Sequence, residues 1–145
     1  MSEGRLADRA YTGIVAIINQ EHLETGDRLP SEARLAALIE QEMTRLENAL
    51  LSSGPAHLED MALHRAIVLG TCNSAFVSAF DHMFANIDRI MKAGVDISRS
   101  RPPKVIGAML SEHQMIVEAI RVQDADGAAL AMRWHLSQGR KRLMP

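Results

Sequence analysis

The chain has 145 residues, of which 47% are hydrophobic and 23% are charged, and its formal net charge at pH 7 is −2. This composition indicates a soluble globular protein of about one domain, and the charge excludes attraction to nucleic acid through net charge alone. No apolar run approaches the roughly 18 residues of a membrane span, and residues 1–10 lack the apolar segment of a signal peptide. The single cysteine, Cys72, excludes an internal disulfide and fits a cytoplasmic location.

Hydrophobic side chains that recur every three to four residues predict a series of helices. In chain order the predicted helices cover residues 5–20, 33–51, 56–70, 74–92, 104–123 and 126–142. The connections are "SSGP" at 52–55, "GTCN" at 70–73, a loop "KAGVDISRSRPP" at 92–103, and a turn at 124–127 in which an aspartate can cap the last helix. No stretch has the alternating pattern of a strand. The sequence therefore predicts an all-α, antiparallel helical bundle with short connections.

The stretch "LEDMALHRAI" at 58–67 places an acid and a histidine four residues apart. On a helix, Asp60 and His64 lie on one face, which is a common chelating geometry. The same spacing also arises by chance, because two groups alone do not hold an ion. Two further histidines strengthen the metal interpretation.

His113 lies 11 residues before Asp124 and His135 lies 11 residues after it, each on the apolar stripe of its predicted helix. A helical hairpin folded at this turn brings the two imidazoles level with each other. Three imidazoles and a carboxylate suit a divalent first-row ion, Zn²⁺ first, with Mn²⁺ and Ni²⁺ as alternatives. His82 and His57 are rival ligands, and buried histidines without any metal are the alternative interpretation.

Other polar groups give weaker signals. Glu112 is next to a candidate ligand in sequence and is therefore expected to point elsewhere, which leaves the site without a general base. The basic residues Arg140, Lys141 and Arg142 are interpreted as a solvated helix end that complements the helix dipole. The sequence contains no glycine-rich phosphate loop and no Cys-x-x-Cys motif.

Two stretches together resemble the GntR family of bacterial transcription regulators, in its branch with an FCD effector domain. "RLADRAYTGIVAIINQEHLETGDRLPSEARLAA" is similar to the opening of the GntR winged helix-turn-helix. "LEDMALHRAIVLGTCNSAF" and "EHQMIVEAI…DADGAALAMRWHL" are similar to the FCD pattern, in which an Asp-x-x-x-His helix is followed by an Asn and two later histidines. The resemblance divides the chain into residues 1–38, a partial helix-turn-helix segment, and residues 39–145, an FCD-like domain.

In many FCD domains the matching residues bind a metal that helps to hold a small carboxylate effector. By position, the resemblance implies the ligands Asp60, His64, His113 and His135, and it places Asn73 at the border of the effector pocket. It makes His57 and His82 weaker candidates. It also implies a cytoplasmic homodimer.

The family's recognition helix, β-wing and first FCD helices have no counterpart near residue 38. Sequence readout by a helix-turn-helix requires the recognition helix in the major groove. Without that helix, Arg28, Ser31 and Arg34 would supply phosphate contacts, which position a protein on DNA without selecting a sequence. The resemblance leaves open whether the chain as it stands binds an operator.

Three functions remain after these observations. The resemblance favours a ligand-responsive transcription regulator that is not an enzyme. A metal-dependent enzyme on a helical bundle would need a base beside the ion. A metal-free dimerisation module would need only buried histidines. Turnover would distinguish the enzyme, and carboxylate binding without turnover would distinguish the regulator.

Overall fold

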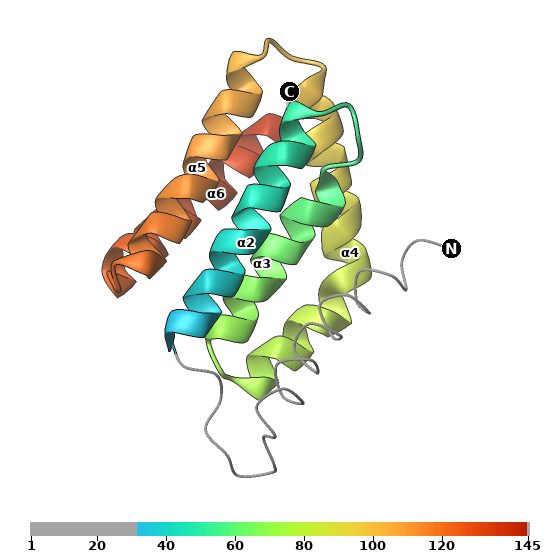
Figure 1. Ribbon diagram of the computed structural model, residues 1–145. Coiled ribbons are helices and arrows are strands. Elements are labelled where there is room, and N and C mark those ends of the chain that lie inside the picture. The colour runs from blue at the N-terminus through green and yellow to red at the C-terminus, as the bar shows by residue number, and fades with distance from the viewer. Residues whose placement is uncertain (1–31, 145) are drawn as a thin grey trace.

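Five helices make up residues 32–144, the part of the chain that the computed structural model describes (Figure 1). They are α2 (Glu32–Leu51), α3 (His57–Gly70), α4 (Ser74–Arg99), α5 (Lys104–Arg121) and α6 (Ala125–Leu143). No strand occurs within these residues, so the predicted all-α class is confirmed for them. The helix predicted over residues 5–20 lies outside the described part.

Consecutive helices run in opposite directions, as short connections between helices require. The pairs α2–α3, α3–α4 and α5–α6 lie side by side, whereas α4 and α5 diverge from their shared connection. In Figure 1 the α2–α3 and α4–α5 connections share one end of the bundle with the C-terminus, and the α3–α4 and α5–α6 connections lie at the other end. This topology places α5 and α6 next to each other as an antiparallel pair.

The core lies between the apolar stripes of the helices, and α2, α3, α4 and α5 all contribute to it. Side chains that are almost fully buried include Leu46, Met61, Leu63, Val95 and Ile116. Each large apolar side chain removed from water in this way contributes about 1.5–3 kcal/mol to folding. The bundle is therefore held mainly by apolar packing, and the polar groups found inside it call for a separate explanation.

Helix α4 differs from the prediction, because it continues to Arg99 where a loop from residue 92 was expected. The prediction of that loop was wrong. Gly94 is a weak helix breaker that costs about 1 kcal/mol relative to alanine. The burial of Val95 and Ser98 on the extended part outweighs that cost, so the connection shortens to residues 100–103.

The last residue of α4 ties this end of the bundle together. Arg99 donates hydrogen bonds to the backbone carbonyls of Ala49, Ser52 and Gly54 at 2.8, 3.0 and 2.5 Å. These carbonyls lie at the end of α2 and beyond it, where the helix leaves acceptors without partners. Arg99 therefore acts as a side-chain cap for a different helix.

The first half of α4 carries an apolar stripe that the described bundle does not cover. The spacing of Phe76, Phe80, Met83, Ile87 and Ile90 alternates between four and three residues. Phe76, Met83 and Ile90 expose 52%, 52% and 56% of their surface. Within α4 the structure buries Val95 and Ser98, both in the last two turns. This apolar stripe of α4 therefore faces solvent in large part.

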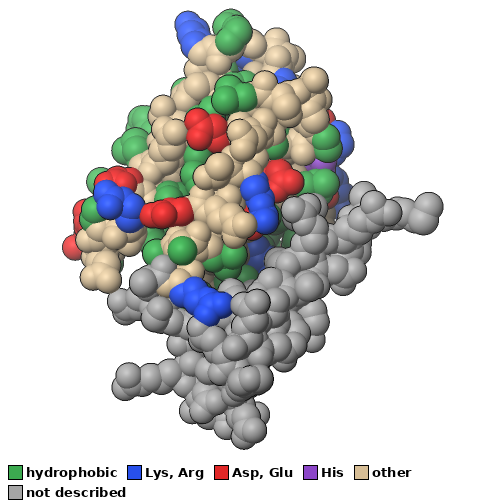
Figure 2. Space-filling view, viewed as in Figure 1, with side chains coloured by type: hydrophobic (Ala, Val, Ile, Leu, Met, Phe, Trp, Pro, Cys, Tyr) green, Lys and Arg blue, Asp and Glu red, His purple; other side chains and the backbone are tan. Residues whose placement is uncertain are grey.

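The remaining surface is mixed in charge. On the face shown in Figure 2, acidic and basic side chains are interspersed and no patch of a single sign dominates. Among the described helices none combines the length and the hydrophobicity that crossing a membrane requires. Helix α2 passes through residues 38 and 39 without a break, and the division of the chain at that point stays a prediction.

Candidate metal centre

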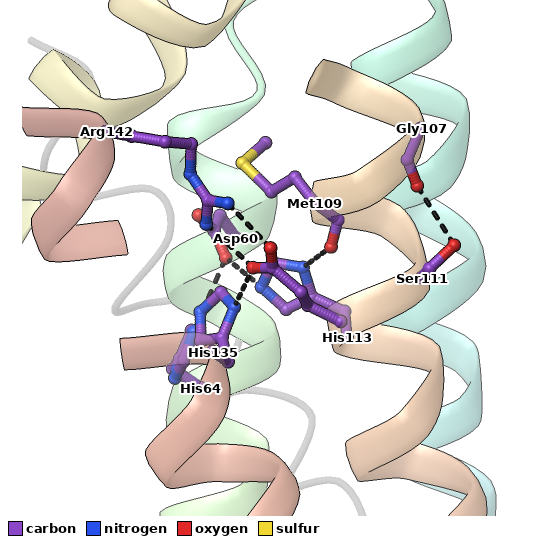
Figure 3. A network of polar contacts seen from close by, with 9 residues as sticks. Asp60, His64, Gly107, Met109, Ser111, His113, His135 and Arg142 are labelled. Atoms are coloured by element: carbon purple, nitrogen blue, oxygen red, sulfur yellow. Dashed lines mark hydrogen bonds and ion pairs between the residues drawn. The ribbon is translucent and has the colours of Figure 1, made fainter. Parts of the chain in front are cut away.

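Three imidazoles from three helices meet inside the bundle (Figure 3). His64 comes from α3, His113 from α5 and His135 from α6. The ring centroids of His113 and His135 are 4.2 Å apart, and the ring of His64 lies 5.2 Å from His135 and 5.6 Å from His113. His113 is completely buried. Buried, clustered imidazoles of this kind need partners that apolar packing does not provide.

The tight reversal between α5 and α6 brings His113 and His135 level. Gln123 adopts a left-handed backbone with φ of 59°, and Asp124 caps α6 by accepting from the backbone N–H of Gly127 at 2.9 Å. A Cβ at Gly127 would collide with the Asp124 carboxylate, so this position favours glycine. The predicted hairpin and the pairing of its two histidines are therefore confirmed, while their role as ligands stays a prediction.

Asp60 lies against two of the three imidazoles. Its Oδ1 is 2.9 Å from His113 Nε2 and 3.5 Å from His64 Nε2, and its side chain is buried. The separation from His113 is short enough for a hydrogen bond, but the groups are not aligned for one. Asp60 Oδ1, His64 Nε2 and His113 Nε2 are all buried without a hydrogen-bond partner. Leaving three such atoms unsatisfied is costly, so this cluster is suited to a further ligand.

The spacing of these atoms fits a divalent cation. Two ligands bound about 2.1 Å from one ion are separated by roughly 3.0–3.4 Å for octahedral or tetrahedral angles. The two Asp60–histidine distances, 2.9 and 3.5 Å, lie just outside this range at its lower and upper ends. One ligand atom from each histidine lies within 4.8 Å of the others. Asp60 does not belong to that mutually close set, although it adjoins two of its members.

The outward nitrogens of two imidazoles have acceptors that select their tautomer. His113 Nδ1 is 2.8 Å from the backbone carbonyl of Met109, and His135 Nδ1 is 3.0 Å from the carboxylate of Glu112. A carbonyl and an ionised carboxylate only accept, so each Nδ1 carries the proton in the neutral ring. The lone pair then resides on Nε2, as it does in metal-bound histidines oriented by an outer acceptor.

Glu112 is buried in this cluster, so the expectation that it points away was wrong. Adjacent helical residues diverge by about 100°, so His113 reaches Asp60 of α3 while Glu112 reaches His135 of α6, the helix against which α5 packs. Arg142 donates through Nη1 and Nη2 to the two oxygens of Glu112, at 2.7 Å each. Arg142 is therefore not a solvated helix-end residue as predicted, whereas Arg140 and Lys141 are exposed.

Neither Glu112 nor Arg142 was predicted from the sequence as part of this site. Two signals were available. Glu112 lies 12 residues before the turn residue Asp124, so a hairpin brings it nearly level with His135. Arg142 follows His135 by seven residues, which is two helical turns along the same face.

Burial and the mutual contacts change the pKa values of this cluster. Burial raises the pKa of Asp60, but the adjacent imidazoles, His113 first, lower it further, so the carboxylate is ionised. Burial lowers the pKa of His64 to about 4 against the opposing effect of Asp60, so His64 is neutral at pH 7. Burial also lowers the pKa of His113, but the Asp60 carboxylate raises it above its usual value. Burial raises the pKa of Glu112, yet His135 and Arg142 bring it to about 2.

The rival histidines lie elsewhere. His57 Nε2 is 3.9 Å from Asp88 Oδ1. His82 is exposed and its Nδ1 is 2.7 Å from the backbone carbonyl of Ser78. Among the described residues neither joins the set of histidines whose ligand atoms are mutually close. The structure thus groups the histidines that the sequence analysis preferred.

The remaining predicted residues lie apart from the histidines or outside the description. Asn73 is exposed and caps α4, where its Oδ1 accepts from the backbone N–H groups of Ala75 at 3.1 Å and Phe76 at 3.2 Å. Its predicted contact with an effector stays a prediction. Arg34 lies in the first turn of α2 and is partly buried, whereas Arg28 and Ser31 lie outside the described residues.

Comparison with known proteins gives one family. The FCD domain matches residues 28–138, which is more than half of the chain. The match includes all three clustered histidines and Asp60, and it ends before Arg142. No curated protein matches the chain.

Proposed function

This chain belongs to the FCD domain family, the effector-binding domains of GntR-type regulators, and we propose that it regulates transcription by binding a small carboxylate metabolite at a divalent metal. The proposed ligands are Asp60, His64, His113 and His135. One observation carries the proposal. Three buried polar atoms of this set converge without hydrogen-bond partners, at separations that suit ligands of one cation.

The donor set also indicates the class of ion. Imidazole nitrogens with one carboxylate oxygen suit Zn²⁺, with Mn²⁺ and Ni²⁺ as alternatives. When bound, the ion would supply a Lewis-acid centre to which a carboxylate oxygen of a metabolite can attach. The chain's own contribution is to keep Asp60 ionised and His64 neutral at pH 7, so that both groups are in the protonation state that metals bind.

Among residues 32–144, the buried glutamate at the site is poorly suited to act as the base that a hydrolytic enzyme would need. Glu112 is the buried glutamate nearest to the imidazoles, and both of its oxygens are engaged by Arg142 and His135. A carboxylate with a pKa of about 2 and occupied lone pairs is a poor general base at neutral pH. This arrangement supports a binding function over catalysis.

A regulator must pass the effect of the ligand to DNA. We propose that the bound carboxylate favours one packing of the helices, and that residues 39–145 pass this change to residues 1–38. The ligand can shift this equilibrium only through its different affinity for the two packings. Arg28, Ser31 and Arg34 are the proposed phosphate contacts, and Asn73 is the proposed neighbour of the effector. The protein is proposed to work in the cytoplasm.

We also propose that the regulator is a homodimer joined through α4. The stripe from Phe76 to Ile90 has the alternating four- and three-residue spacing of a helix that packs against another helix. Three of its members are more than half exposed, so a second copy could bury the same stripe across a two-fold axis.

Met83→Glu should give a monomer in sedimentation velocity. Leu130→Glu, at an exposed leucine of α6, should leave the dimer intact. A monomeric wild-type chain would contradict the proposal.

Metal analysis tests the central proposal. Protein purified without chelator should contain about one ion per chain by elemental analysis, and His113→Ala and His135→Ala should each lose it. His82→Ala is the matched control and should keep it, because His82 is exposed and bonded elsewhere. The metal-loaded wild type should then gain thermal stability with small carboxylates, and the metal-free protein should not. A wild type that takes up no Zn²⁺, Mn²⁺ or Ni²⁺ would refute the site.

A further inference from the structure

Glu112 contacts His135 and Arg142 contacts Glu112, and neither residue is a proposed metal ligand. We propose that Glu112 and Arg142 are positioning residues that hold His135 in the tautomer and orientation required for binding a cation. This inference rests on the proposed metal site. Neither residue would touch the ion, because Glu112 contacts the ring nitrogen on the other side of His135 and Arg142 contacts Glu112.

Glu112 is in direct contact with His135. Oε2 of Glu112 is 3.0 Å from His135 Nδ1, and both residues are buried. An ionised carboxylate cannot donate, so this contact requires a proton on Nδ1 and leaves the lone pair on Nε2. A ring with the opposite tautomer would present an N–H to the other imidazoles, where it could not bind a cation.

Arg142 in turn fixes the orientation of Glu112. The guanidinium of Arg142 donates to both oxygens of Glu112 in two parallel bonds of 2.7 Å. Such a fork restricts rotation of the carboxylate as well as stabilising its charge. Arg142 therefore holds both oxygens, and Oε2 is directed at His135 as well.

Arg142, which fixes Glu112, is itself held in place. Arg142 is in the last turn of α6, where helices usually fray. Its backbone carbonyl accepts from Arg101 Nη2 at 3.1 Å, which ties the end of α6 to the α4–α5 connection. Arg142 also lies beyond residue 138, where the match to the FCD domain ends. Arg142 thus belongs to a part of the chain that the family match does not cover.

The test compares two charge pairs of the same kind. Glu112→Gln removes the charge behind His135 while keeping the size of the side chain. Asp81→Asn is the control, because it removes the carboxylate from another two-bond arginine pair that joins two helices, with Arg65. Zn²⁺ affinity is measured by competition with a coloured chelator. The visible spectrum of bound Co²⁺ reports the geometry of the ligands, and thermal unfolding in EDTA reports the fold.

We expect Glu112→Gln to weaken Zn²⁺ binding about 10- to 100-fold and to alter the Co²⁺ spectrum, as loss of an outer partner does at other metal sites. Arg142→Gln should act in the same direction with a smaller effect. Asp81→Asn should match the wild type. A folded Glu112→Gln protein with wild-type Zn²⁺ affinity and an unchanged spectrum would overturn this inference alone. A wild type that binds neither ion would overturn the proposed metal site as well.

If Glu112→Gln does not fold, a measurement on the wild-type protein still tests the role of Glu112. Long-range ¹H–¹⁵N correlation of the metal-free wild type reports which nitrogen of each neutral imidazole carries the proton. We expect His135 to be protonated at Nδ1. A proton on Nε2 of the neutral His135 ring would contradict the role given to Glu112.

Discussion

Two arginine–carboxylate pairs of the same design lie in different surroundings. Arg65 and Asp81 join α3 to α4 through two bonds of 2.9 Å, and Arg142 and Glu112 join α6 to α5 through two bonds of 2.7 Å. The side chain of Asp81 is 40% exposed, whereas that of Glu112 is 7% exposed. Water can replace the partner of Asp81 but not that of Glu112. The same fork therefore has a different energetic value in each place.

The second difference is the third partner. Glu112 also accepts from His135, whereas the described contacts of Asp81 are those with Arg65. One pair is thus connected to the candidate metal centre, while the other holds two helices together at the surface. Variants of the two pairs can therefore distinguish the effect of burying an ion pair from the effect of its contact with the candidate metal centre.

The largest expected effect is that of Arg142→Ala. Removing the guanidinium leaves the buried Glu112 carboxylate without its counter-charge, and breaking a buried pair in this way costs about 3 kcal/mol. We expect that loss in the free energy of unfolding, measured by urea denaturation with EDTA present. Asp81→Ala, the control in the exposed pair, should cost less than about 1 kcal/mol. Equal losses would show that burial does not distinguish the pairs.

The next effect separates charge from shape. Arg142→Lys keeps a positive charge beside Glu112 but cannot form two parallel bonds. We expect it to recover roughly half of the stability lost in Arg142→Ala, a difference of about 1–2 kcal/mol. The same denaturation experiment measures this. Full recovery would show that charge alone holds Glu112, and the proposed orientation of His135 would then lose its basis in the fork.

The helix boundaries show how far local signals determine this fold. The ends of α2 and α3 coincide with "SSGP" and "GTCN", and the α5–α6 turn coincides with "DADG", all of which contain strong helix-ending residues. Gly94 is a weak signal by comparison. Whether α4 stops there depends on the burial of Val95 and Ser98 against other helices, which no local pattern reveals.

In the candidate site, too, some contacts follow from local sequence signals and others depend on how the helices pack. The positions of His113 and His135 follow from equal distances to one turn, so the sequence alone predicts their contact. Glu112 was expected to point away from the site, on the assumption that a residue next to a ligand in sequence faces elsewhere. That assumption fails because α5 packs between α2, α4 and α6 and buries more than one face. The Arg142 contact depends on the same packing.

The smallest expected effect is the response of the two pairs to salt. In 1 M NaCl the screening length falls to about 3 Å, and exposed charges are screened far more than buried ones. A double-mutant cycle on Arg65 and Asp81 should give a coupling energy of at most about 1 kcal/mol at low salt, and it should approach zero in 1 M NaCl. The coupling between Arg142 and Glu112 should change little, because protein rather than water surrounds it. If both couplings fell by the same fraction, solvent would reach Glu112 in solution, and the carboxylate would lack the fixed position that its proposed role behind His135 requires.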